Sequence, residues 1–211
     1  MTFAQALLGF AAVAAVLTVI PGLDTTLVLR SALVRGRGYA FATGLGVCVG
    51  ALIWGAAAAV GAAALLAASE LAFRVVTLAG AAYLCVLGVV LIVQSFRKGA
   101  TDTGRTARAA TGPAWRGFLA GVWTNLLNPK VGVFYLATIP QFIPQGFWPL
   151  GMGLLLAAVH AALALVWFGL IIAGASYARR WFDDARRLRV VDRIAGTILV
   201  AFGVRLALPA H

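Results

Sequence analysis

Two charged side chains lie within long apolar stretches of the 211-residue sequence, each beside a residue that breaks helices. The first is Asp24, which follows Pro21 and Gly22. The second is Lys130, which directly follows Pro129. Proline lacks a backbone N–H and obstructs the preceding turn, so a helix is expected to kink or break at both places. If these stretches cross a bilayer, the acid, the amine and the two breaks predict a polar site inside the membrane, because lipid tolerates such groups only around a protein-lined cavity.

The composition indicates that these stretches do lie in a bilayer. The sequence is 63% hydrophobic and only 11% charged, with a mean hydropathy of +0.98, whereas about a quarter of the residues of a soluble domain are charged. About 20 apolar residues suffice to cross a membrane. Four ranges contain no Asp, Glu, Lys or Arg: 3–23, 39–69, 75–96 and 131–178. We therefore predict an all-α integral membrane protein with a single transmembrane domain over residues 1–211.

The charges and cysteines argue against several other classes of function. A net charge of +11 and a pI near 11.3 would favour nucleic-acid binding in a soluble protein. Here the basic residues lie in short loops between apolar ranges, which is the pattern that orients membrane proteins. Cys48 and Cys85 lie within apolar ranges and are interpreted as packing residues. The sequence thus predicts no nucleic-acid partner, no metal site and no cofactor.

The charges and breaks divide the sequence into six expected membrane spans. The first covers about residues 3–33 and is broken at Pro21 and Gly22. The fourth begins near residue 115, is broken at residues 128–130 and ends at residues 140–144. Segment 97–115, rich in Thr, Ala, Gly and Arg, is interpreted as a solvated linker. The remaining spans are expected at about residues 39–68, 75–96, 148–175 and 190–208.

Basic residues predict how these spans are oriented. The loops after spans one, three and five hold 14 of the 17 lysines and arginines. They are therefore expected on the cytoplasmic side of the cytoplasmic membrane, with both termini outside. Asp192, Arg193 and Arg205 intrude near the ends of the sixth span. A five-span form with a cytoplasmic C-terminus is the alternative.

The second half of the chain repeats the landmarks of the first half. Gly9 precedes Pro21 by the same twelve residues that separate Gly117 from Pro129. Two further patterns recur in the same order, at residues 44–46 and 151–153 and at residues 74–89 and 189–204. Because each half would contain three spans, an odd number, the second half would enter from the opposite side. We expect a 3+3 inverted repeat with broken helices one and four, formed by residues 1–96 and 116–211 on either side of a cytoplasmic linker at 97–115, a plan in which many transporters bind substrate between broken helices.

With these features the sequence resembles the LysE/RhtB family of amino-acid exporters over nearly its whole length. The resemblance depends on the glycine-rich second span, on Gly80 to Gly88, and on the segments 21–24 (Pro-Gly-Leu-Asp), 125–130 (Asn-Leu-Leu-Asn-Pro-Lys) and 140–142 (Pro-Gln-Phe). The family's first break usually reads Pro-Gly-Pro followed by Asp or Asn, so Leu23 is a departure. The resemblance implies a secondary transporter, not an enzyme, that exports amino acids or close derivatives and is coupled to the proton gradient. It leaves open which amino acid is exported.

Both breaks contribute to the chemistry expected for such a substrate. Half-helices that restart after Pro21 and Pro129 would point N–H groups and the positive ends of their dipoles into the core. Asp24 is expected to bind the substrate ammonium or to carry the coupled proton. Lys130 is expected to hold the substrate carboxylate or to pair with Asp24. The alternatives are that Asp24 caps the resumed helix and that Lys130 snorkels to the membrane interface.

Polar neighbours complete the expected substrate- and proton-binding site. Thr and Asn side chains could bind the ligand, but they also join membrane helices to one another. His160 could relay protons because histidine titrates near neutral pH, or it could simply bond a neighbouring helix. The full set of expected site residues is Pro21, Gly22, Asp24, Thr25, Asn125, Asn128, Pro129, Lys130 and His160.

Three other functions compete with amino-acid export. A divalent-metal exporter would need several carboxylates or carbonyls, and Asp24 is the only clearly intramembrane carboxylate. A membrane thiol-transfer protein would need Cys48 and Cys85 to meet, and the sequence has no Cys-x-x-Cys motif. A passive channel is less consistent with broken helices in an inverted repeat. Glycine- and alanine-rich faces leave room for a homodimer.

Overall fold

The first predicted break separates two helices at Pro21. The computed structural model describes residues 1–96, 112–182 and 184–207. Helix α1 (Phe3–Val19) begins with a capping box between Thr2 and Gln5 and ends just before the proline. Helix α2 (Leu23–Arg35) resumes after Gly22, bent by 54° from α1. The predicted break in the first span is confirmed.

The second break is built from an asparagine followed by a proline. Helix α5 (Ala114–Leu126) has Leu127 as its C-cap, and α6 (Pro129–Thr138) begins directly after Asn128. The side-chain oxygen of Asn128 accepts a hydrogen bond from Lys130 N at 3.1 Å, which caps α6. Pro129 occupies the first helical position, where a missing N–H costs nothing. Helix α6 then continues into the short 3-10 helix η1 (Ile139–Phe142). The second predicted break is also present.

Within the described ranges, three further helices are long and apolar enough to cross a membrane, and the bent pair α1 and α2 raises the number to four. They are α3 (Arg37–Ala68), α4 (Glu70–Phe96) and α7 (Pro149–Ala173). The last helix, α9 (Ala185–Ala207), does not meet the same criterion. No strand occurs among the described residues. The described part of the chain is therefore an all-helical protein with several apolar spans.

Two connections differ from the sequence-based expectation. Ser69 alone separates α3 from α4, so α4 begins at Glu70 rather than near residue 75. The basic segment after α7, expected to be a loop, contains the short helix α8 (Ala175–Phe182). Most of the expected linker, residues 97–111, lies outside the described residues.

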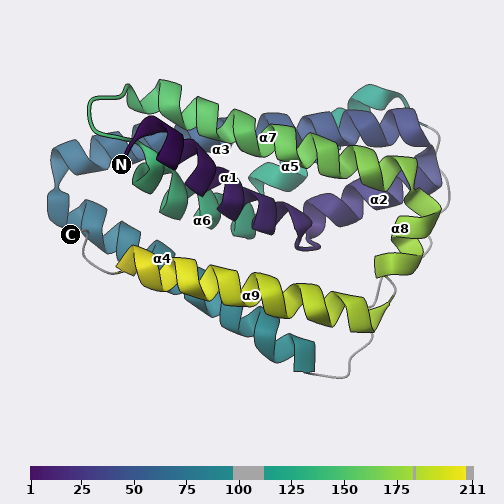
Figure 1. Cartoon of the computed structure of the whole chain (residues 1–211). Coiled ribbons are helices and arrows are strands. Elements are labelled where there is room, and N and C mark those ends of the chain that lie inside the picture. The colour runs from purple at the N-terminus through teal and green to yellow at the C-terminus, as the bar shows by residue number, and fades with distance from the viewer. Residues whose placement is uncertain (97–111, 183, 208–211) are drawn as a thin grey trace.

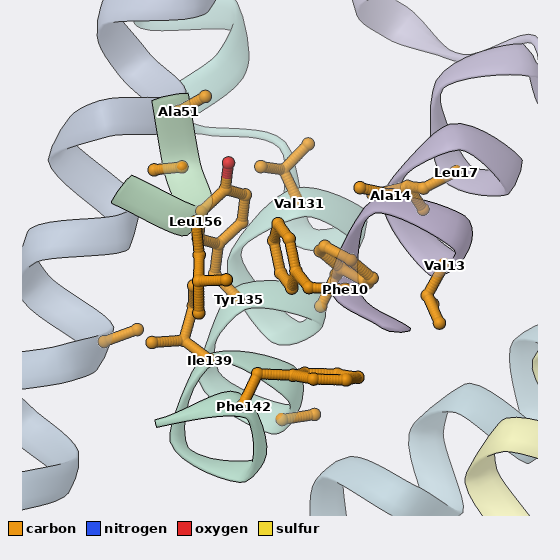
Figure 2. Packing of buried hydrophobic residues seen from close by; sticks show 14 of the residues in the cluster. Phe10, Val13, Ala14, Leu17, Ala51, Val131, Tyr135, Ile139, Phe142 and Leu156 are labelled. Atoms are coloured by element: carbon orange, nitrogen blue, oxygen red, sulfur yellow. The ribbon is translucent and has the colours of Figure 1, made fainter. Parts of the chain in front are cut away.

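The two broken elements run in opposite directions (Figure 1). Phe10 of α1 packs with its ring centroid 6.0 Å from that of Phe134 and 5.7 Å from that of Phe142. Two turns further along α1, the carbonyl of Leu17 lies near Lys130 at the start of α6. Figure 2 shows Phe10 extending from α1 toward the segment that follows Pro129, with Phe142 below it and Leu17 further along α1. Helices α1 and α6 are therefore antiparallel, and their broken ends meet.

The ends of the helices that adjoin the basic segments lie on one side of the protein. Arg37 Nη2 donates to Ala173 O at 3.4 Å, which joins the start of α3 to the end of α7. Arg193 Nε donates to Ser95 Oγ at 3.0 Å, which joins the start of α9 to the end of α4. In Figure 1 this end also carries α8, and α1 begins at the opposite end. The described helix ends next to the three basic segments thus lie on one side.

Glycines allow pairs of helices to touch backbone to backbone. A Cβ at Gly46 of α3 would overlap the carbonyl oxygen of Phe118 in α5. Across α4 and α9, a Cβ on either Gly88 or Gly196 would lie 2.5 Å from the carbonyl oxygen of the other. Lipid supplies no hydrophobic driving force between helices, so close packing of this kind must hold them together.

Replacing Gly46 should weaken the packing of α3 on α5. We expect Gly46→Ala to lower the free energy of unfolding by about 1–3 kcal/mol, since overpacking forces the backbones apart. Gly61→Ala on the same helix is the matched control, because a Cβ there meets nothing within 4 Å. It should be neutral or stabilising by about 1 kcal/mol through helix propensity. Thermal unfolding of the detergent-solubilised variants measures both, and equal midpoints would contradict the packing argument.

Candidate functional site

Asp24 and Asn125 connect the two breaks directly. Asn125 Nδ2, in the last turn of α5, donates to Asp24 Oδ2 at 2.9 Å. Gly50 leaves space for the Asn125 side chain, because a Cβ at this position would lie only 2.8 Å from Asn125 Oδ1. Trp54 Nε1 donates to the backbone carbonyl of Asn125 at 3.4 Å. Helix α3 therefore positions the asparagine that bonds the carboxylate.

The carboxylate of Asp24 does not cap its own helix. Gly22 is the N-cap of α2 and makes no side-chain capping bond, while Asp24 lies in the first turn. The N-cap alternative is therefore wrong. An anion in the first turn is still favoured by the helix dipole, and its hydrogen bond points across to the second break.

Lys130 donates hydrogen bonds to backbone carbonyls at the C-terminal end of α1. Its Nζ lies 3.5 Å from the carbonyl oxygen of Leu17 and 3.5 Å from that of Ile20. In an unbroken helix the Leu17 carbonyl would accept the N–H of residue 21, but Pro21 has none. The ammonium group supplies the missing donor, and a cation is favoured at a helix C-terminus.

The position of Lys130 changes two expectations. Its ammonium contacts the α1 carbonyls and lines the cavity rather than extending away from the protein, which does not fit the snorkelling alternative. The expected direct pair with Asp24 is also not formed, since Asp24 bonds Asn125 and Lys130 bonds backbone oxygens. The two charges instead line one cavity.

The cavity between the breaks has a water-accessible volume of about 40 Å³. Because one water needs about 10–15 Å³ on this measure, the cavity has room for a few water molecules. Among the described residues that line it, Asp24 is the only carboxylate and Lys130 the only ammonium. The lining residues are Leu17, Thr18, Ile20, Gly22, Asp24, Thr25, Val47, Cys48, Ala51, Asn125, Asn128, Lys130, Val131, His160, Ala164 and Phe168.

Two acceptors at this cavity have no hydrogen-bond donor. Asp24 Oδ1 and Asn125 Oδ1 are buried and have no partner among the described residues. Asn125 itself is only 2% exposed. Buried polar atoms are normally paired, so two unpaired acceptors on adjoining side chains need an explanation. An ammonium group, which carries only donors, has the chemistry to satisfy both.

The structure brings most of the expected site residues together. Seven of the nine line the cavity, whereas Pro21 and Pro129 act through the backbone at the breaks. The ring of His160 stacks on that of Tyr135, and its Nδ1 lies 2.8 Å from the Tyr135 hydroxyl. This histidine is therefore both bonded to a neighbouring helix, α6, and exposed to the cavity.

Sequence reasoning missed the apolar part of the cavity. Cys48, interpreted as a packing residue, lines the cavity and donates its thiol to Ala161 O at 3.6 Å. Cys85 instead donates to Val200 O of α9 at 3.8 Å. The only available signal was spacing, because Gly44, Cys48 and Ala51 fall on one helical face. The described residues contain no group of three or more His, Cys, Asp or Glu able to hold a metal ion.

The contact between Lys130 and α1 should depend on Pro21. Lys130→Met is expected to reduce the free energy of unfolding by about 1.5–3 kcal/mol, the range for hydrogen bonds to charged groups. In a Pro21→Ala background the loss should be smaller, because a backbone N–H becomes available to the Leu17 carbonyl. Arg205→Met, on the exposed part of α9, is the control.

Thermal unfolding of the two single variants and the double variant gives the coupling energy. Strictly additive effects would show that the lysine does not replace the donor that the proline lacks.

Comparison with known proteins agrees with this arrangement. The family model described as LysE type translocator matches residues 15–209. The chain is 30% identical over 208 residues to the Uncharacterized membrane protein YrhP of Bacillus subtilis, covering 97% of this chain and 99% of the relative. In Salmonella typhimurium it is 26% identical to the Leucine efflux protein (90% and 89% covered) and 24% identical to the Threonine efflux protein (88% and 89% covered). No solved structure matches. The chain therefore belongs to the LysE type translocator family, and it is a multi-pass membrane transport protein rather than an enzyme.

Proposed function

We propose that this protein exports an amino acid or a close derivative from the cytoplasm in exchange for protons, through the cavity between the two breaks. Relatives along most of the chain are named as leucine and threonine efflux proteins. The observation that carries the proposal is the pair of unpartnered acceptors, Asp24 Oδ1 and Asn125 Oδ1, in a cavity that also holds one ammonium group, that of Lys130.

The two ends of an amino acid match the two sides of this cavity. The substrate ammonium would donate to Asp24 and Asn125, whose free oxygens belong to adjoining side chains. The substrate carboxylate would accept hydrogen bonds from Lys130 Nζ. In the structure this ammonium makes long contacts of 3.5 Å to backbone carbonyls. Charge-assisted bonds to a carboxylate are stronger than bonds to neutral carbonyls, so the exchange is favourable. Thr25 and Asn128 line the same cavity and are proposed to complete the binding site.

Competition for a single carboxylate would couple export to protons. Asp24 can bind either the substrate ammonium or a proton, but not both in the same geometry. Release of substrate on the outer side would allow protonation, and loss of the proton on the inner side would restore the binding form. His160 faces the same cavity with its Nδ1 held by Tyr135, and it is the proposed second proton-binding group.

We propose a six-span, 3+3 inverted repeat in which residues 1–96 and 116–211 form the two halves and 97–115 the linker. Support comes from the antiparallel course of the broken elements and from the close packing of α9 along α4 at Gly88 and Gly196. Helix α9 has 23 residues, about 35 Å at 1.5 Å per residue. That length suffices for a hydrocarbon core of about 30 Å.

The basic face would lie in the cytoplasm and both termini outside the cytoplasmic membrane. This orientation is supported by the shared position of the described helix ends next to the basic segments, which the Arg37–Ala173 and Arg193–Ser95 contacts join. A reporter fused after residue 211 tests this orientation. We expect alkaline phosphatase, which is active only outside the cytoplasm, to be active there, and green fluorescent protein to be dark. The reverse result would establish the five-span alternative.

Asp24→Asn should abolish proton-coupled export and leave the protein in the membrane. Losing one member of a buried charge pair costs about 2–5 kcal/mol, or roughly 30-fold or more in rate where the pair binds substrate. The control is Asp184→Asn, because Asp184 forms an exposed ion pair of 3.1 Å with Arg187. Efflux from dipeptide-loaded cells, with and without an uncoupler, provides the measurement. Wild-type efflux by Asp24→Asn would remove this carboxylate from the mechanism.

A further inference from the structure

Building on the proposed function, we propose that the substrate carries an uncharged aliphatic side chain, and that Cys48, Ala51, Ala164 and Phe168 form the wall that selects it. These four residues, here called the apolar wall, line the cavity from α3 and α7. All four are buried, with exposed fractions between 4% and 7%. The wall can therefore make dispersion contacts with the side chain of a substrate that is bound by the polar side of the cavity.

Three polar groups near the wall are already hydrogen-bonded within the protein, whereas the buried Trp167 Nε1, next to Phe168 in the chain, has no partner among the described residues. The Cys48 thiol donates to the Ala161 carbonyl at 3.6 Å. The Thr18 hydroxyl, also at the cavity, donates to the Ala14 carbonyl at 2.7 Å. The Tyr135 hydroxyl, which would otherwise be free, is engaged with His160. Next to these three groups, a polar substrate side chain would thus lose its hydrogen bonds to water without gaining equivalent ones, which disfavours it.

The charged side chains that line the cavity match the two charges of a zwitterion and leave no partner for a third charge. Asp24 and Lys130 are the only carboxylate and the only ammonium among its described lining residues. The amino and carboxyl groups of the substrate would use both. A lysine or arginine side chain would add a cation with no counter-charge, close to Lys130, and a glutamate side chain would add an unpaired anion close to Asp24. A buried charge without a partner is strongly unfavourable.

Phe168 limits the length of the side chain. A Cβ at Gly44 of α3 would lie 3.2 Å from Phe168 Cδ2, so the ring lies directly on the α3 backbone. Phe168 also belongs to the buried cluster that contains Val28, one turn beyond Asp24 on α2. The ring therefore lies between α7 and α3. The side chain of a substrate bound at Asp24 would extend into this same space. Branched aliphatic side chains fit this space better than aromatic ones, because the cavity is small.

A panel of dipeptides tests the inference. Cells that express the protein are loaded in turn with dipeptides that release alanine, valine, leucine, phenylalanine, lysine or glutamate, and the initial efflux rate is measured against vector-only cells. We expect valine and leucine to be exported fastest, and lysine and glutamate at the vector rate. Phe168→Ala should increase phenylalanine export relative to valine export by about 10-fold, the lower end of what a change of pocket size achieves. Val166→Ala is the matched control, because Val166 lies on the same helix and is 66% exposed, and it should leave the profile unchanged.

The outcomes separate this inference from the function on which it depends. Export of lysine or glutamate as fast as leucine would overturn the inference and leave amino-acid export in place. If none of the six amino acids is exported by protein detected in the membrane fraction, the proposed function itself fails. An unchanged profile in Phe168→Ala would remove Phe168 from the wall. Should that variant not reach the membrane, Phe168→Leu, which keeps more of the buried volume, repeats the test with the same expected direction.

Discussion

Each helix break in this protein supplies a hydrogen-bond donor to a group at the other break. The first break leaves the carbonyl of Leu17 without a donor, because the residue four positions on is Pro21, and the ammonium of Lys130 provides that donor from the second break. The second break places Asn125 at the end of α5, and Asn125 bonds the carboxylate of Asp24 in the first. In a bilayer such groups cannot turn to water, so the breaks must meet to be stable. The cavity is a consequence of that meeting, because four helix ends cannot fill space as closely as continuous helices do.

Much of this arrangement could be predicted because proline and charge are strong signals in an apolar sequence. Proline determines where a helix stops, and a lone charge in lipid requires a partner, so Asp24 and Lys130 could be assigned to one site without coordinates. The partner of each charge could not be assigned. A direct ion pair is one of the two roles expected for Lys130, whereas the carboxylate bonds an asparagine and the ammonium bonds backbone oxygens. Such contacts depend on angles between half-helices, such as the 54° bend at Pro21, and local sequence does not encode these angles.

The apolar wall of the cavity could not be assigned from the sequence for a related reason. Cys48 and Ala164 stand among many residues of similar size and polarity, and only the packing of α3 and α7 decides which of them face the cavity. Glycines carry partial information, because a glycine inside a helix marks a close approach, as at Gly50 beside Asn125. They do not say what approaches. Helix α8 was missed because a short basic segment next to a span has the composition of a loop, whatever its backbone conformation.

The two charges differ in how firmly their own helices hold them, and this difference suits a transport cycle. Asp24 lies in the first turn of α2, where the helix dipole favours an anion. Lys130 lies in the first turn of α6, where the same effect disfavours a cation, and its ammonium is held by long contacts to the carbonyls of α1. The lysine is therefore the more easily displaced of the two. A carboxylate that draws it away would free the end of α1 from the start of α6, and occupancy of the cavity would then act directly on the contact that holds the two breaks together.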